Sequence, residues 1–430
     1  TSGHVDVPIL IDDEAEDVET FLLHLTAAGT AAIVRSPATC SISDVLRTYT
    51  VAPTGSDSNP GTPGAPFATI QRARDVVAVI YALGIEPPGG ITVMLQAGRH
   101  ALAEPVVFGP EHSGRPGAPV TYCAAPGARV RLSGGVRLQA GWFTPVTAAD
   151  PVWPRLDSSA QGQVLKADLT TQGIADGGTL SRRGYGKDAV LSGLEFVVDG
   201  TPQQLARWPN AEGFQTVGTV QTTTRFTYSG TRPERWSHAP EPWVHGYWFH
   251  LWADEHLPVS AIDTAAKTFT LGGEHTYGLK AGQPFYVYNL IEEIDSPGEW
   301  YLDRTAGILY TWPSAPLADA ELEIAMANGP LLHLQNARCL RFVDLTLECT
   351  RGELVRMDGG ADNRFERCIL RNCGTNAAVV DGRDNGLHAC TVTDAGSGGV
   401  KLAGGDRATL EDGRNFVTNC SMTRFGRWCW

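Results

Sequence analysis

The chain has 430 residues, of which 42% are apolar and 19% are charged, and its formal net charge is −13. A disordered chain would carry more charge and fewer apolar residues, so this composition excludes one. The acidic balance argues against nucleic acid as a partner, because phosphates attract a basic surface. The longest apolar run, at 76–85, is about half the ~18–20 residues of a membrane-spanning helix, so no membrane is expected either.

Residues 1–48 predict a small N-terminal β-α-β appendage. Apolar runs at 7–11 and 30–34 are typical of short strands. Between them, residues 12–28 have helical periodicity behind an acidic first turn, with apolar positions at Val18, Phe21, Leu22 and Leu25. The chain begins at Thr1 with no leader segment, so we expect either a removed leader or a longer parent protein.

Residues 49–135 predict an N-terminal capping helix and the first strands of the main body. The helix should end near Gly84, because apolar side chains recur at helical spacing at Phe67, Ile70, Ala73, Val77 and Ile80. Short strands are predicted at 91–95, 105–108, 120–123 and 130–132. A helix placed before such strands would cover an otherwise exposed sheet end.

Residues 136–318 predict an inserted, antiparallel, β-rich domain. Nine of the 11 Trp residues of the chain lie in this segment. Stretches of alternating polarity bounded by turns, such as 194–199 and 268–271, favour antiparallel strands. We expect this insertion to pack beside the main body.

Residues 319–430 contain an internal repeat. Strands at equivalent positions follow one another at offsets of 23, 22 and 30 residues, beginning at Phe342, Phe365, Leu387 and Val417. A second set aligns in the same way, beginning at Val355, Ala378 and Val400. A period near 22–23 residues predicts a solenoid, and a right-handed parallel β-helix fits better than a leucine-rich repeat. The predicted fold class is therefore mainly β.

The cysteines follow the same repeat. The chain has nine of them, an odd number, and seven lie within 319–430. Three occupy one repeat position, beneath Leu345, and should form an interior column of buried free thiols: Cys368, Cys390 and Cys420. A second column is expected to stabilise turns rather than bind ligands: Asn363, Asn385 and Asn415.

Several motifs resemble known carbohydrate-active proteins. Val51-Ala-Pro-Thr-Gly-Ser-Asp-Ser-Asn-Pro-Gly-Thr and Pro66-Phe-Ala-Thr-Ile-Gln resemble the start of many secreted right-handed β-helix proteins that act on polysaccharides. Leu205-Ala-Arg-Trp-Pro-Asn and Gly298-Glu-Trp-Tyr-Leu-Asp-Arg-Thr-Ala-Gly-Ile-Leu-Tyr-Thr-Trp-Pro are similar to the β-helix proteins with an inserted β domain that are grouped around glycoside hydrolase family 141.

This resemblance covers residues 49–430 and leaves the first 48 residues unexplained. It implies a carbohydrate substrate, a secreted or extracytoplasmic location, and catalytic aspartates in the later coils. Relatives continue for several more coils, and a solenoid needs a cap at each end. We therefore expect the chain to be truncated after Trp430 relative to them.

Candidate catalytic residues are aspartates in the repeat. Glycosidic hydrolysis usually takes two carboxyl groups, ~5–5.5 Å apart for retention and ~6.5–9.5 Å apart for inversion. Stacking of equivalent positions should bring Asp358 beside Asp381 and Asp384 beside Asp406. We predict that Asp381, Asp384 and Asp406 are catalytic and that Asp358 binds substrate. In the alternative, structural interpretation, these residues are ordinary turn aspartates.

Basic and aromatic residues are weaker candidates. Lys401 and Arg407 are predicted to contact substrate. Together with Arg383, they could recognise an acidic sugar or supply the base of a lyase. In the alternative interpretation, these three residues are solvated cations or partners in ion pairs. Arg207 and Trp208 are predicted to form part of a sugar-binding wall, with Asn210, Trp248, Trp252 and Asp254. Trp is also common in the cores of β domains.

No cofactor or metal is predicted. Oxygen-rich side chains at Asp57, Ser58 and Asn59 leave calcium as an open alternative, although a loop is the simpler interpretation. Glu292, Glu293 and Asp295 form an acidic group within a turn region.

Three functions remain open from the sequence. The first is a glycoside hydrolase acting on a plant or algal cell-wall polysaccharide or oligosaccharide through paired aspartates. The second is a polysaccharide lyase of pectate-lyase type, and the third is a non-catalytic carbohydrate-binding or truncated β-helix protein. The acidic net charge argues mildly against a strongly anionic substrate and so favours the hydrolase.

Overall fold

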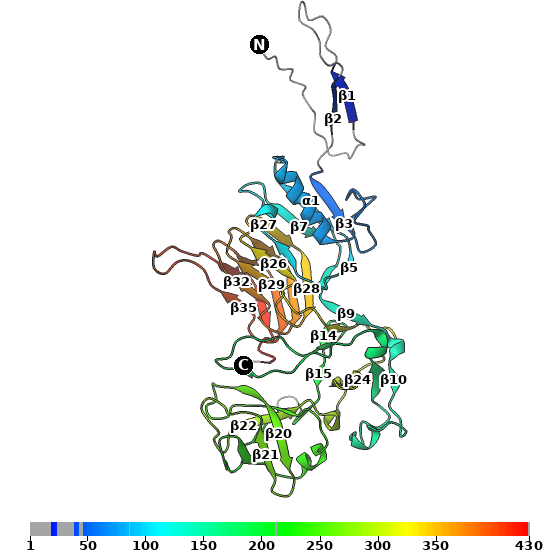
Figure 1. Cartoon of the computed structure of the whole chain (residues 1–430), viewed down its shortest axis with the longest axis vertical. Coiled ribbons are helices and arrows are strands. Elements are labelled where there is room, and N and C mark those ends of the chain that lie inside the picture. Colours follow the sequence, from blue (N-terminus) through cyan, green and yellow to red (C-terminus); the bar gives the residue numbers. More distant parts are fainter. Residues whose placement is uncertain (1–18, 24–37, 43–45, 86, 211–212, 429–430) are drawn as a thin grey trace, which may run out of the picture.

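The computed structural model describes residues 19–23, 38–42, 46–85, 87–210 and 213–428. These residues are mainly β, and strands from both ends of the main body share three parallel sheets (Figure 1). Within these ranges, no helix is long and apolar enough to cross a membrane.

In each of the three parallel sheets, neighbouring strands come from neighbouring repeats of the chain. The first sheet contains β3 (Thr48–Val51), β4 (Ile91–Leu95), β7 (Val120–Ala124), β27 (Leu340–Val343), β30 (Arg364–Glu366), β33 (Gly386–His388) and β36 (Phe416–Thr418). The second contains β5 (Gly98–Ala101), β8 (Val130–Ser133), β28 (Leu345–Thr350), β31 (Ile369–Cys373), β34 (Thr391–Ala395) and β37 (Ser421–Thr423). The third contains β6 (Val106–Phe108), β26 (Leu332–Gln335), β29 (Val355–Asp358), β32 (Ala378–Val380) and β35 (Val400–Leu402).

The interior of these sheets is filled by columns of equivalent side chains. Phe342 stacks on Tyr122 at a centroid distance of 5.3 Å and on Phe365 at 4.6 Å, so one aromatic column crosses three repeats. Aromatic pairs of this kind contribute about 0.5–1.5 kcal/mol beyond their burial. Cys368 and Cys390 are buried as free thiols, and the Cys390 N–H donates to Cys420 Sγ at 3.3 Å. The predicted interior cysteine column is thus confirmed for Cys368 and Cys390, whereas Cys420 stacks in the same column but is only partly buried.

The asparagine column closes the turns before the first sheet. The Asn363 N–H donates to Asn385 Oδ1, and the Asn385 N–H donates to Asn415 Oδ1, both at 2.9 Å. The Asn385 amide also donates to the Asp381 carbonyl at 2.7 Å. These are turn-stabilising bonds, as the sequence predicted, because each side-chain amide satisfies backbone groups of the preceding repeat or of its own turn.

Helix α1 (Ile70–Ala82) covers the first repeat, as predicted. Thr69 is its N-cap and accepts the Arg72 N–H, and the buried face consists of Ile70, Ala73, Val77 and Ile80. Phe67 lies before the helix and instead forms a parallel bridge with Val51. Asp57 accepts the Ala68 and Thr69 N–H groups at 2.9 Å each, so its carboxylate fastens the loop to the helix start.

The inserted segment forms three mainly antiparallel sheets. One contains β14 (Thr201–Pro202), β13 (Phe196–Val198), β25 (Leu322–Ala325) and β9 (Gly135–Leu138). Another contains β10 (Thr144–Pro145), β11 (Leu165–Asp168), β24 (Ile308–Trp312), β23 (Glu299–Asp303) and β15 (Gln204–Leu205). The largest contains β16 (Arg207–Trp208), β22 (Pro284–Tyr288), β19 (Trp243–Gly246), β20 (Glu255–Asp263), β21 (Thr268–Leu271) and β18 (Arg225–Thr227), with β12 (Arg183–Gly184) and β17 (Gln215–Thr216) at its sides.

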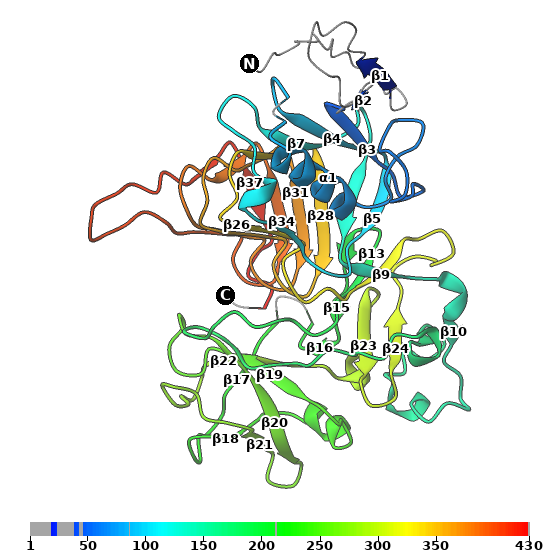
Figure 2. The same ribbon diagram turned by 45° about the horizontal axis from the view of Figure 1, so that its top comes forward.

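The loops contain short 3₁₀ helices: η1 (Pro110–His112), η2 (Ala140–Trp142), η3 (Trp153–Arg155), η4 (Thr170–Gln172), η5 (Arg232–Trp236) and η6 (Ile291–Glu293). Both views show the largest inserted sheet at the bottom of the molecule, with α1 in its upper half (Figures 1 and 2). The strand patterns expected at 194–199 and 268–271 correspond to β13 and β21.

The N-terminal β-α-β prediction is wrong where the structure describes it. Residues within the predicted helix form β1 (Glu19–Leu23), which pairs antiparallel with β2 (Ala38–Ile42). Thr20 and Phe21 favour strands, and a short helix without tertiary support is marginal, so pairing with a second strand outweighs the helical pattern. The predicted strands at 7–11 and 30–34 lie outside the described residues.

The asparagine column generates a stability prediction. Replacing Asn385 with Ala leaves the buried N–H of Asn363 and the Asp381 carbonyl without their partners. We expect a loss of about 1–3 kcal/mol in the free energy of unfolding, measured by urea denaturation. Exposed Asn328→Ala is the control and should change it by less than about 0.5 kcal/mol; equal effects of the two changes would contradict the proposed role.

Candidate functional site

Polar side chains collect on the outer face of the third sheet. Leu332 and Leu334 of β26 point into the core, so the alternation of the strand turns His333 outward. On β29, Met357 is buried, and Arg356 and Asp358 therefore share the outer face with His333. We call this group, together with Glu353 and Asp381, the third-sheet cluster.

Polar contacts join four members of the third-sheet cluster, namely His333, Asp358, Arg356 and Glu353. His333 Nε2 lies 2.7 Å from Asp358 Oδ2, and Arg356 Nη1 lies 3.3 Å from Asp358 Oδ1. The same guanidinium contacts Glu353 Oε2 through Nε at 3.0 Å. One arginine therefore bridges the two carboxylates of Glu353 and Asp358. The distance between these carboxylates is limited by the width of one guanidinium group and the lengths of the two contacts.

The two bridged carboxylates have different surroundings. The Glu353 side chain is only 13% exposed, and burial raises its pKa, although Arg356 opposes the rise. Asp358 is 47% exposed and faces two potential cations, Arg356 and His333. A carboxyl group with a raised pKa beside a more accessible carboxyl group is a combination that acid–base catalysis uses.

Asp381 lies beside Asp358 in the next repeat, as the sequence predicted. Its N–H donates to the Met357 carbonyl at 2.9 Å, which continues the parallel register beyond β32. Equivalent residues on neighbouring strands are about 4.8 Å apart. Asp381 Oδ1 also accepts the Gly382 N–H at 2.7 Å, so this aspartate additionally stabilises its own turn.

The predicted stacking of Asp384 on Asp406 is wrong. Asp384 lies beside Arg414, and their bidentate ion pair has contacts of 2.7 and 2.6 Å that lower the pKa of Asp384. Asp406 belongs to a hairpin in which it bridges Glu411. Its carboxylate accepts the Ala408 and Thr409 N–H groups, which lowers its pKa. The physical reason is the longer repeat there, whose extra residues form the hairpin.

The basic candidates lie at or near this hairpin. Lys401 continues the outward-facing column of Arg356 and Val379 on the third sheet and is exposed. Arg407 is exposed on the hairpin. Arg383 pairs with Glu411 at 2.5 Å. A role for Lys401 or Arg407 in substrate binding stays a prediction.

Arg207 and Trp208 make packing interactions in the insertion. Arg207 is 8% exposed, lies 3.5 Å above the Tyr286 ring centroid, and donates to the Pro209 and Gly213 carbonyls. Trp208 packs edge-on against Trp236 at a centroid distance of 5.5 Å. These contacts favour the core interpretation over the sugar-binding wall.

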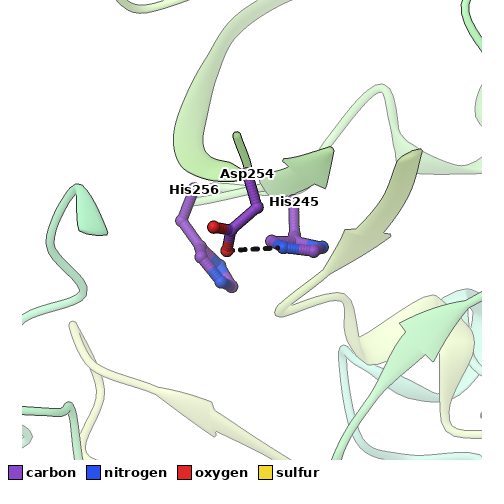
Figure 3. A group of neighbouring side chains, drawn as sticks. All are labelled: His245, Asp254 and His256. Atoms are coloured by element: carbon purple, nitrogen blue, oxygen red, sulfur yellow. Dashed lines mark hydrogen bonds and ion pairs between the residues drawn. The ribbon is translucent and has the colours of Figure 1, made fainter. Parts of the chain in front are cut away.

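Other members of the predicted wall separate into exposed and buried residues. Trp252 is 53% exposed and stacks on His250 at 4.9 Å, whereas Trp248 and Asp254 are fully buried. Asp254 lies with His245 and His256 in a buried trio whose donor atoms are all within 4.8 Å of one another (Figure 3). Among the described residues, this trio is the group of His, Cys, Asp and Glu side chains that could hold a metal ion.

A cleft of about 780 Å³ lies between the second sheet and the insertion, and sequence reasoning did not find it. Five arginines line it together with acidic residues: Arg99, Arg129, Arg131, Arg137 and Arg371. Four of these arginines make ion pairs with Glu321, Glu323 or Glu348. The cleft is large enough for a sugar unit, since ligand pockets range over ~300–1,000 Å³.

Buried carboxylates of the insertion are held by ion pairs or by backbone hydrogen bonds. Glu292 contacts Arg155 at 2.8 Å, and Glu293 contacts Arg232 at 2.6 Å. Glu299 accepts the Asp295 and Ser296 N–H groups, yet burial raises its pKa to about 8. These interactions indicate a structural role for the acidic turn.

Comparison with known proteins supports the fold. No protein-family model and no curated protein matches the chain. A solved structure described as "Glycoside hydrolase" matches with a TM-score of 0.68 and 19% identity, over 89% of this chain and 74% of that chain. One described as "The complex structure of XylC with xylose" has a TM-score of 0.39 and 12% identity, over 81% of this chain and 53% of that chain. The first likeness shows a shared fold.

Glu299 generates a pH prediction. Its folded-state pKa of about 8 exceeds the ordinary value of 4.5, so between these values the folded protein binds more protons than the unfolded chain. Its contribution to stability therefore falls as the pH rises through this window, by up to about 1.4 kcal/mol per pH unit. We expect Glu299→Gln to flatten the pH dependence of the free energy of unfolding between pH 5 and 8 in chemical denaturation. Parallel curves for the two proteins would contradict the assignment.

Proposed function

We propose that the chain is a glycoside hydrolase that cleaves O-glycosidic bonds of a plant or algal cell-wall polysaccharide or oligosaccharide on the outer face of the third sheet. We further propose that the three parallel sheets form a right-handed parallel β-helix of the kind grouped around glycoside hydrolase family 141. The motifs at Leu205 and Gly298 and the shared fold with a protein described as a glycoside hydrolase support this proposal. A secreted or extracytoplasmic location accompanies it.

The observation that carries the proposal is the convergence of three carboxyl groups in the third-sheet cluster. Glu353, with its raised pKa, is suited to protonate the leaving oxygen of a glycosidic bond. Asp358, contacted by Arg356 and His333 and partly exposed, is positioned to act as the base or nucleophile. No cofactor is required, because the carboxyl groups supply both proton transfers.

The spacing of the carboxylates favours this chemistry. Asp358 and Asp381 are one strand apart, about 4.8 Å between backbones, which is close to the ~5–5.5 Å of a retaining pair. The span of the Arg356 bridge between Glu353 and Asp358 is compatible with the ~6.5–9.5 Å of an inverting pair. Asp358 belongs to both pairs and is therefore the central residue of the proposal.

The charged side chains on the outer face of the third sheet also suit a polysaccharide. Arg356, His333 and Lys401 form polar positions along the outer face of one sheet. An extended sugar chain lying across such a face can donate hydroxyl hydrogen bonds to the aspartates and accept them from the cations. The site of cleavage would then lie above Asp358.

Replacing Asp358 with Asn is the first test of this function. We expect kcat to fall by about 10²–10⁴-fold on a cleaved glycan, because acid–base and nucleophilic groups contribute that much. Activity is measured as reducing ends released from a panel of cell-wall glycans. Asp319→Asn, an exposed aspartate outside the cluster, is the matched control and should retain full activity. Full activity of Asp358→Asn would contradict the proposed site.

A second comparison separates the carboxylate sets. Asp381→Asn should reduce kcat, whereas the geometry predicts retained activity for Asp384→Asn and Asp406→Asn, because these carboxylates pair with Arg414 or their own loop. If Asp384→Asn and Asp406→Asn lost activity while Asp381→Asn retained it, Asp384 and Asp406 would be the catalytic residues instead. Hydrolysis gives only new reducing ends. A cleavage product that also absorbs in the near ultraviolet would instead identify a lyase.

A further inference from the structure

Two histidines and an aspartate meet inside the largest inserted sheet. β19 and β20 are antiparallel, and His245 lies directly opposite His256 in their register. Asp254 immediately precedes β20, and all three side chains are fully buried. Figure 3 shows the Asp254 carboxylate between the two imidazole rings. The fold thus holds three potential metal ligands together without solvent access.

The distances between the donor atoms suit a single small ion. His245 Nε2 lies 3.1 Å from Asp254 Oδ2, and one donor atom from each of the three residues lies within 4.8 Å of the others. Ligands at the ~2.0–2.1 Å typical of zinc are about 3.3 Å apart in a tetrahedral site. Small side-chain rotations would therefore bring all three donors onto one ion.

Neighbouring groups orient two of the ligands. The Tyr288 hydroxyl lies 2.9 Å from His256 Nδ1, which leaves Nε2 as the ligand atom of that ring. The backbone N–H of Tyr185 donates to Asp254 Oδ1 at 3.2 Å, which leaves Oδ2 toward His245. Outer hydrogen bonds of this kind fix the ring and carboxylate orientations of metal ligands.

We propose that His245, Asp254 and His256 bind a divalent transition-metal ion of the zinc class, which clamps β19 to the loop before β20. Two imidazole nitrogens and one carboxylate select zinc-like ions over calcium or magnesium, which take oxygen ligands. Because the three side chains are buried, the ion would be structural and separate from the third-sheet cluster. It would also support Trp428, whose ring lies 6.2 Å from that of His256.

The competing arrangement is a hydrogen-bonded trio without an ion. In it, Asp254 only orients His245, and the backbone of Trp428 interacts with His256. The charges of Arg183 and Arg207 lower the pKa of His256 and would also oppose a bound cation. The two arrangements differ in metal content, spectrum and response to chelators, so experiment separates them.

Cobalt titration of the chelator-treated chain, with no polyhistidine tag, tests the site directly. We expect saturation at about one Co²⁺ per chain, with the visible absorption of a tetrahedral nitrogen–oxygen site, and its displacement by ZnCl₂. The thermal unfolding midpoint should fall on chelation and recover with ZnCl₂, since a ligand of the folded state stabilises it. Absence of both stoichiometric binding and a midpoint shift would overturn the proposal.

Asp254→Asn is the matched variant, because the amide retains a hydrogen-bond acceptor for His245 but loses the charge. We expect cobalt affinity to fall at least about 10-fold and the ZnCl₂-induced midpoint shift to disappear. His238→Gln, an exposed histidine elsewhere in the insertion, should leave both unchanged. Undiminished cobalt binding by Asp254→Asn would contradict the assignment, and the wild-type titration decides the case if this variant does not fold.

Discussion

The structure depends on the parallel register between successive repeats. In each of the three sheets, a strand pairs with the equivalent strand of the next repeat. A slip of one residue would turn inward side chains such as Phe365 and Leu370 outward, because strand side chains alternate with period two. The Asn363–Asn385–Asn415 column opposes such a slip by bonding each turn to the next.

A second column keeps the corners of the repeats alike. Asp362, Asp384 and Arg414 occupy equivalent corner positions before the first sheet, and all have positive φ, between 51° and 55°. Such a conformation costs an L-residue about 1–2 kcal/mol. The corner charges help to offset this strain, since Asp384 pairs with Arg414 and Asp362 pairs with Arg341 of the preceding repeat. The corners and turns of successive repeats therefore follow the same register as the strands.

The third-sheet cluster is a consequence of this register. Asp358 and Asp381 are distant in sequence, yet equivalent positions place them side by side. The repeat period in the sequence predicts which carboxylates stack, and the prediction is confirmed for Asp358 and Asp381. The predicted stacking of Asp384 on Asp406 is wrong, because the hairpin at 404–413 lengthens one repeat. As a result, Asp384 pairs with Arg414.

Features without a local period could not be predicted. The helix expected over the N-terminal segment is a strand at Glu19–Leu23, because pairing with a distant strand outweighed its helical pattern. The cleft of about 780 Å³ is lined by Arg99 and Arg371, which lie far apart in the sequence, and no sequence spacing predicts that they share it. Glu353 is distinguished only by its burial and its bridge to Asp358 through Arg356, which spacing does not reveal either.

The most direct test of the proposed site is a crystal structure of the Asp358→Asn variant with a bound oligosaccharide from the cell-wall panel. We predict that the sugar lies across the third sheet, with a glycosidic oxygen within hydrogen-bonding distance of Glu353 or Asp381. Sugar bound in the arginine-lined cleft with the third sheet bare would contradict it.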